Sequence, residues 1–352
     1  MRELYEKLNE QISKVDFNAI WDGFSRYPFA LYDENNVYLQ NETIPYDQRF
    51  IGNTSIEYNG EYIAIWYVED HSKEDVELLA ADIVHEMFHA FQRSKDESRF
   101  PNDLLMLNYP ENEENYAIKY SENLLLVKAC LSDDINEKRE YIKQFFSARK
   151  FREGLIGDII NQEYLSETIE GMADYAGCMA LKQISESKYN ARIKHYIKNL
   201  SALDERFFDI RRMLYYSGAI FCIQLAQAGL EFHHTVGEIK QPLFSLAAGN
   251  TKAAKPDIAI DTNMIKMHMD KNALEKKNKF DEFLLSHNEE VIYDSFICGY
   301  DPMNMIKMND KILCGHFIML QNEKNDSPEF IQGPVLVNLK PGSVNKVLSY
   351  IR

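Results

Sequence analysis

KEDVELLAADIVHEMFHAFQ, residues 73–92, has the spacing of an amphipathic helix. Apolar residues recur in it at intervals of three and four, as they do in a helix that buries one face. Ser72, with Asp75 three residues later, fits a capping box, so we expect the helix to begin near Lys73. The predicted buried stripe consists of Val76, Leu79, Ile83, Met87 and Phe91.

A polar line of side chains lies beside this stripe and includes both histidines of HEMFH, residues 85–89. Helical residues four apart lie on one face, so the imidazoles of His85 and His89 can reach one metal ion. Glu86 is one step round the helix, where it can serve as a general base toward water. This is the HExxH pattern of zinc hydrolases. The alternative is an ordinary amphipathic helix with two partly exposed histidines.

A third ligand is expected on another helix, because residues 90–95 lack the glycine and histidine of the longer metzincin motif. The stretch SETIEGMADYAG, residues 166–177, has a helical period and contains Glu170, which completes a His₂Glu set. Glu167 is the second choice. Asp174, one turn beyond Glu170, can orient a ligating histidine by accepting a hydrogen bond from its free ring nitrogen.

Two glycines in the same stretch, Gly171 and Gly177, each cost a helix about 1 kcal/mol relative to alanine. We therefore expect them where two helices approach closely.

HExxH followed by a helical Glu-Gly-x-Ala, here residues 170–173, resembles the gluzincin metallopeptidases, particularly the zinc aminopeptidases. The spacing of Glu170 and Asp174 is similar to the thermolysin-type pattern. A third match is YYSGA, residues 215–219, ahead of an apolar helix predicted over 220–230. The resemblance rests on these short motifs, which together lie between about residues 60 and 230.

The resemblance implies a zinc peptidase that binds one Zn²⁺ per chain through His85, His89 and Glu170. It implies that Glu86 transfers the proton of the attacking water to the leaving amine, and that Tyr215 stabilises the oxyanion. Tyr216, or His233 and His234, are the alternatives for that donor. The substrate would be a peptide or an unfolded protein segment.

The chain departs from the family in two places. Glu170 follows His89 by 81 residues, a long spacer that predicts an insertion at about 96–160 with helices over 115–130 and 136–150. We expect this insertion to wall or cover the cleft. The chain also lacks the Gly-Ala-Met-Glu-Asn segment with which the aminopeptidases hold a free amine, so exopeptidase activity is not implied.

Two apolar runs, 54–58 and 61–69, flank Asn59-Gly60 and predict a β-hairpin. The second run is apolar on both faces. It resembles the family's strand that precedes the metal helix and pairs with extended substrate backbone.

The predicted fold class is α+β, a mainly helical gluzincin-type catalytic domain with a small N-terminal antiparallel sheet and a β-containing C-terminal lobe. The domains expected are 1–72, an α/β part of the catalytic unit; 73–240, the helical metallopeptidase domain; and 241–352, a C-terminal α/β lobe. The remaining elements expected are strands over 29–32 and 37–40, a helix over 271–286, strands over 290–299, 311–321 and 333–339, and a turn over 322–327.

Composition limits the partners. The 352-residue chain has a formal charge of −16 and no concentrated basic stripe, which argues against nucleic acid. No apolar run is long enough for a membrane span, and no signal sequence is evident. The five cysteines form no CxxC pair, so a reduced, cytoplasmic location is expected. The oligomeric state is left open. Two other functions stay possible: hydrolysis of a non-peptide amide or ester, and binding by an inactive peptidase-like protein.

Overall fold

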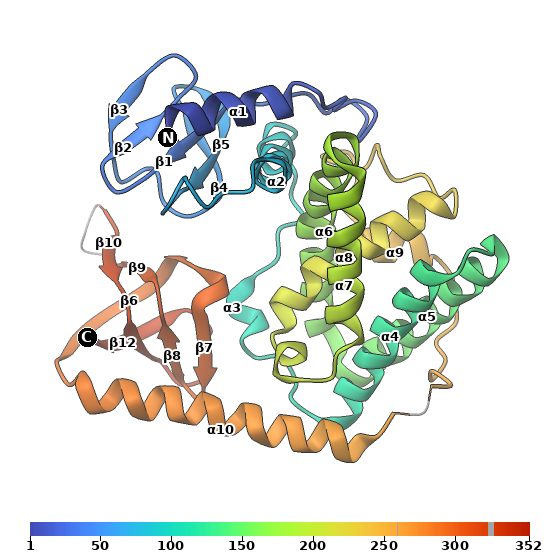
Figure 1. Ribbon diagram of the computed structural model, residues 1–352. Coiled ribbons are helices and arrows are strands. Elements are labelled where there is room, and N and C mark those ends of the chain that lie inside the picture. Colours follow the sequence, from blue (N-terminus) through green and yellow to red (C-terminus); the bar gives the residue numbers. More distant parts are fainter. Residues whose placement is uncertain (259, 323–326) are drawn as a thin grey trace.

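The structure is a computed structural model that describes residues 1–258, 260–322 and 327–352. Its class is α+β, as predicted. A small sheet with helix α1 (Arg2–Ile12) lies at one corner, a helical body follows, and a β-rich lobe lies below the first sheet (Figure 1).

The N-terminal sheet is mixed, not antiparallel as predicted. β1 pairs in parallel with β5, whereas the other neighbours are antiparallel. Each turn in the sequence specifies only its own hairpin, and nothing local specifies the direction in which two hairpins meet. The strands are β1 (Phe29–Tyr32), β2 (Asn36–Tyr38), β3 (Thr43–Pro45), β4 (Thr54–Tyr58) and β5 (Glu61–Tyr67), in the order β3-β2-β1-β5-β4.

β5 is an internal strand, which explains why it is apolar on both faces. Its backbone is bonded to β1 on one side and to β4 on the other. The expected pairing of residues 61–69 with substrate backbone is therefore wrong, because both hydrogen-bonding edges are occupied. β4 is the edge strand beside it.

Helix α2 (Val76–Ser94) carries HEMFH and begins three residues later than predicted. The hydroxyl of Ser72 donates to Asp70 over 2.6 Å, so it does not cap the helix. Asp75 is the cap instead, accepting hydrogen bonds from the amides of Glu77 and Leu78. The predicted stripe packs into the core, with Leu79, Ile83, Met87 and Phe91 all buried and Val76 half-buried.

The helical body contains the two helices expected in the insertion, α4 and α5. α8 begins ten residues before the predicted helix, so YYSGA lies within it and not ahead of it. Asp209 caps this start by accepting from the amide of Arg212. The helices are α3 (Asp103–Met106), α4 (Glu113–Leu131), α5 (Ile135–Ile156), α6 (Ile160–Ile184), α7 (Glu186–Ser201), α8 (Ile210–Gln227) and α9 (Leu243–Ala248), with short 3₁₀ turns η1 (Gly157–Ile159) and η2 (Glu205–Phe208).

Both glycines of α6 lie at helix crossings, as expected. A Cβ on Gly171 would lie 2.6 Å from the Cα of Gly218 in α8. A Cβ on Gly177 would lie 2.9 Å from the carbonyl oxygen of Ala81 and 3.4 Å from the Cβ of His85, both in α2. The two contacts place α6 directly against the helices that carry HEMFH and YYSGA.

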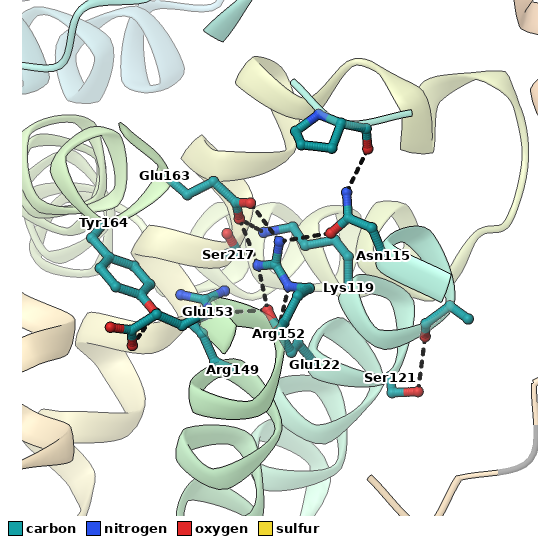
Figure 2. Close-up of polar contacts among 12 residues, drawn as sticks. Asn115, Lys119, Ser121, Glu122, Arg149, Arg152, Glu153, Glu163, Tyr164 and Ser217 are labelled. Atoms are coloured by element: carbon teal, nitrogen blue, oxygen red, sulfur yellow. Dashed lines mark hydrogen bonds and ion pairs between the residues drawn. The ribbon is translucent and has the colours of Figure 1, made fainter. Parts of the chain in front are cut away.

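A buried network of ion pairs attaches the α4–α5 insertion to α6 (Figure 2). Arg152 of α5 binds both Glu122 of α4 and Glu163 of α6. Three cations face three carboxylates, and all six side chains are 0–2 % exposed. The six are Lys119, Glu122, Arg149, Arg152, Glu163 and Glu167.

The C-terminal lobe is a seven-stranded antiparallel sheet with α10 (Thr262–Ser286) packed against it. α10 begins nine residues before the prediction, capped by Asp261. The predicted strand 311–321 is two strands, and residues 323–326 of the predicted turn lie outside the described residues. The strands are β6 (Glu290–Tyr300), β7 (Met305–Met308), β8 (Lys311–Cys314), β9 (Phe317–Gln321), β10 (Glu329–Gln332), β11 (Val335–Leu339) and β12 (Lys346–Ile351), with η3 (Pro302–Asn304).

Both α10 and α3 join the lobe to the helical body. α10 runs from one to the other along the lower edge of the molecule (Figure 1), with Ile265 in the core of the body and Phe280 against the sheet. α3, a helix of the body, contributes Leu104 to the core of the lobe.

Candidate metal centre

His85, His89 and Glu170 meet where α2 crosses α6. The Nε2 atom of His89 lies 3.1 Å from Nε2 of His85 and 3.2 Å from Oε2 of Glu170. Nε2 of His85 lies 3.7 Å from the same oxygen. In the described part of the chain, this is the one cluster of three or more His, Cys, Asp or Glu residues able to hold a metal.

The donor atoms are spaced as zinc ligands are. Ligands about 2.0–2.2 Å from a tetrahedral ion stand roughly 3.3–3.6 Å apart, and the three separations here bracket that range. Two imidazoles and one carboxylate also form the ligand set of many catalytic zinc sites, in which the fourth position is left for water. The three residues thus fit a zinc ion without rearrangement of the backbone.

His89 is oriented by a side chain of its own helix. Its Nδ1 lies 2.7 Å from Oε1 of Gln92, and the Gln92 amide donates to the carbonyl of Ile169 over 3.0 Å. That arrangement puts the proton of a neutral imidazole on Nδ1 and leaves Nε2 free to bind metal. Gln92 follows His89 by three residues on the same helix face, but the sequence alone did not predict this hydrogen bond.

His85 faces Asp174 through its other ring nitrogen. Nδ1 of His85 is 3.7 Å from Oδ1 of Asp174, which is longer than a hydrogen bond. The hydroxyl of Tyr196, from α7, donates to the same oxygen over 3.0 Å. Burial alone lowers the pKa of His85, but Asp174 and Glu170 outweigh it and raise that pKa well above its usual value.

Glu86 is 7 % exposed, and its Oε2 is buried without a hydrogen-bond partner. Burial raises the pKa of Glu86, while the neighbouring His85 and His89 oppose that rise. A carboxylate desolvated without a partner costs stability, so its position has no structural explanation. A raised pKa is what a general base working near neutral pH needs.

Glu170 is held from its far side by a pair that the sequence did not indicate. Nη2 of Arg211, in α8, is 3.4 Å from Oε1 of Glu170, and Nη1 of Arg211 binds Asp103 of α3. Burial raises the pKa of Glu170, but His89 and His85 outweigh it and hold that pKa well below its usual range. The carboxylate is therefore ionised, as a metal ligand must be.

Tyr215 lies at the edge of the cluster. The ring of Tyr215 is stacked nearly parallel to that of His85, with ring centroids 6.2 Å apart. The guanidinium carbon of Arg211 lies over the Tyr215 ring, 5.9 Å from its centroid. Burial and the charge of Glu170 raise the pKa of Tyr215 well above its usual value. The hydroxyl therefore keeps its proton and can donate a hydrogen bond.

The alternative residues lie elsewhere. Glu167 binds Arg149 and accepts from Ser217 in the buried ion network, so it is not a ligand. Tyr216 packs against α7, edge-to-face with the ring of His195 and tilted against that of Tyr196.

The histidine pair after α8 also lies outside the cluster. His233 packs on Trp21 and Phe232 and forms a hydrogen bond with the hydroxyl of Tyr175, and its neighbour His234 is exposed.

Of the four site residues that the sequence analysis did not identify, two could have been found from helical spacing and two could not. Gln92 is three residues after His89, and Arg211 is four before Tyr215, so helical spacing places both beside known site residues. Asp103 and Tyr196 carry no such signal, because only the packing of α3 and α7 brings them to the site.

Comparison with known proteins does not extend these observations: no family model, no curated protein and no solved structure matches the chain. In the described residues, no helix is both long and apolar enough to cross a membrane. All five cysteines are free thiols.

Proposed function

We propose that the protein is a zinc-dependent metallopeptidase of the gluzincin kind. The observation that carries this proposal is that His85, His89 and Glu170 bring their ligand atoms close enough together to hold one ion, beside Glu86, whose buried Oε2 has no hydrogen-bond partner. Bound zinc would supply Lewis acidity, lowering the pKa of water and polarising the scissile carbonyl.

The chain's own residues would do the rest. Glu86 accepts the proton of the attacking water and returns it to the leaving amine. The hydroxyl of Tyr215 donates a hydrogen bond to the carbonyl oxygen that becomes negative. Arg211 and Gln92 keep Glu170 and His89 in place while these charges develop. The five free cysteines support a cytoplasmic location as part of the proposal.

The test is cleavage of a peptide library by the zinc-loaded protein, with a chelator control. Glu86→Gln should retain one zinc per chain and lose turnover, whereas Glu77→Gln, an ion-paired glutamate at the start of the same helix, should keep both. Peptides left intact by protein that holds stoichiometric zinc would contradict the proposal, and cleavage of amide or ester compounds alone would assign a different hydrolase.

Tyr215→Phe tests the oxyanion donor. Loss of one such donor costs about 10²–10³ in kcat, and zinc content should not change because the hydroxyl is not a ligand. An unchanged kcat would remove Tyr215 from the mechanism.

A further inference from the structure

Asp103 and Arg211 form an ion pair on the far side of Glu170 from the histidines. Nη1 of Arg211 binds a carboxylate oxygen of Asp103, and Nη2 lies 3.4 Å from Oε1 of Glu170. The histidines approach the other carboxylate oxygen, Oε2, which is 3.2 Å from Nε2 of His89. The carboxylate of Glu170 thus faces the proposed metal position with one oxygen and the guanidinium with the other.

The three charged side chains in this row are largely buried. The exposed fractions are 15 % for Asp103, 13 % for Arg211 and 12 % for Glu170. Water and salt screen such charges less than they screen charges on the surface, so each charge here strongly affects the next.

The negative charge of Asp103 offsets the positive charge of Arg211. Glu170 is the one anionic residue of the proposed ligand set, because neutral imidazoles carry no charge. A guanidinium that faced Glu170 alone would cancel that charge and would also repel a bound cation. Arg211 is closer to Asp103 than to Glu170, so most of its charge is taken up by Asp103.

Asp103 is held in place by contacts on both sides of it in the chain. The backbone amide of Asn102 donates to Oε1 of Gln162 in α6 over 2.7 Å. Leu104 is buried in the core of the C-terminal lobe. The carboxylate of Asp103 is therefore fixed at the point where it meets Arg211.

We propose that Asp103 is a positioning residue of the metal centre, which takes up the charge of Arg211 so that Glu170 keeps its own negative charge for the metal ion. The inference rests on the proposed function for the identity of that ion as zinc. The simpler role for the pair is attachment of α3 to α8, as an ordinary buried salt bridge. The two roles give different results when both charges are removed together.

Zinc affinity is measured on the full chain by competition with a chromogenic chelator. Asp103→Asn keeps the shape of the side chain and removes its charge. It should weaken zinc binding about 10- to 100-fold, the usual cost of losing a residue that supports a metal ligand. The matched control is Asp47→Asn, which breaks the pair of Asp47 with Arg49 away from the metal centre and should bind zinc as the wild type does.

The double variant Asp103→Asn with Arg211→Gln separates the two roles. It removes the uncompensated positive charge, so it should recover most of the zinc affinity that Asp103→Asn loses. If the pair only attached α3 to α8, the double variant would bind zinc no more tightly than the single one. Thermal unfolding of the metal-free proteins checks that they fold, and Asp103→Ser is used if Asp103→Asn does not.

Three results overturn the inference: unchanged zinc affinity in Asp103→Asn, an equal loss in Asp47→Asn, or a double variant no better than the single one. The inference and the proposed function fail separately. If zinc affinity depends on Asp103 in this way but the wild-type protein cleaves no peptide, hydrolysis is wrong and the role of Asp103 stands. If peptides are cleaved and Asp103→Asn binds zinc normally, the role of Asp103 is wrong and the peptidase stands. A wild-type protein that binds no zinc overturns both.

Discussion

Helix α6 contributes to two buried groups of charges, and they are built differently. Its first half gives Glu163 and Glu167 to the ion network with α4 and α5, where three cations match three carboxylates. Further along, α6 gives Glu170 and Asp174 to the metal centre, where cations and carboxylates are not fully matched. In the described residues, the carboxylates and guanidinium that have a buried atom without a hydrogen-bond partner are Glu86, Asp174 and Arg211, all at that site.

This contrast separates a structural role from a functional one. Burying a charge costs free energy of folding unless the charge is paired. A network in which every charge is paired therefore needs no ligand, and its role is to attach the insertion to α6. Oδ2 of Asp174, about two turns beyond Glu167 in the same helix, and Oε2 of Glu86 in α2 have no hydrogen-bond partner, as the proposed metal site would explain.

The largest effect should come from breaking the paired group. Arg152→Met takes one of two cationic partners from both Glu122 and Glu163 and leaves three buried carboxylates facing two cations, so it should lower the free energy of unfolding by about 3–5 kcal/mol. Urea unfolding of the metal-free protein measures it. A loss under 1 kcal/mol would mean that the network is not a stabilising unit.

The second largest effect should be stabilisation by zinc, which depends on the metal centre and not on the ion network. A ligand that binds only the folded state at about 1,000 times its Kd stabilises by roughly 4 kcal/mol, so zinc should raise the wild-type Tm. Glu170→Ala should lose this shift, whereas Glu186→Ala, an exposed glutamate of α7, should keep it. A full zinc shift in the Glu170 variant would remove Glu170 from the ligand set.

The close crossing of α2 and α6 at Gly177 sets the distance between the histidines of α2 and Glu170 of α6. Gly177→Ala forces a Cβ against the Ala81 carbonyl and should cost about 1–3 kcal/mol of stability. Gly154→Ala, within α5 and with open space around it, should be neutral or stabilise by up to about 1 kcal/mol. Thermal unfolding of the two variants checks this, and equal behaviour would contradict the close approach.

The smallest effect concerns the orientation of one ligand. Gln92→Ala removes the acceptor for His89 Nδ1 and should weaken zinc binding about 10- to 100-fold. Competition with a chromogenic chelator measures the affinity. Gln144→Ala, in an exposed position of α5, is the control, and unchanged affinity in the Gln92 variant would assign that residue to packing alone.

The sequence revealed the parts of the site that one helix contains. The i, i+4 spacing in HEMFH and in Glu170–Asp174 predicts which side chains share a face, and two costly glycines predict where α6 crosses its neighbours. Glu170 could be predicted despite the 81-residue spacer, because the helical Glu-Gly-x-Ala stretch around it marked it as the third ligand.

The rest depends on contacts between segments far apart in the chain. Asp103 reaches Arg211 only because Leu104, its neighbour in α3, is buried in the C-terminal lobe. The parallel pairing of β1 with β5 has no local signal either. Because this pairing was not predicted, residues 61–69 were wrongly expected to have an edge free to bind a peptide. A pocket lined by Arg211 arises in the same way, because its walls come from both the helical body and the C-terminal lobe.

The most direct test of the account is the anomalous zinc signal from crystals of the protein grown with one equivalent of zinc. We expect one ion about 2.0–2.2 Å from Nε2 of His85, Nε2 of His89 and Oε2 of Glu170. An ion bound elsewhere, or protein that binds no zinc while the three side chains keep these positions, would contradict it.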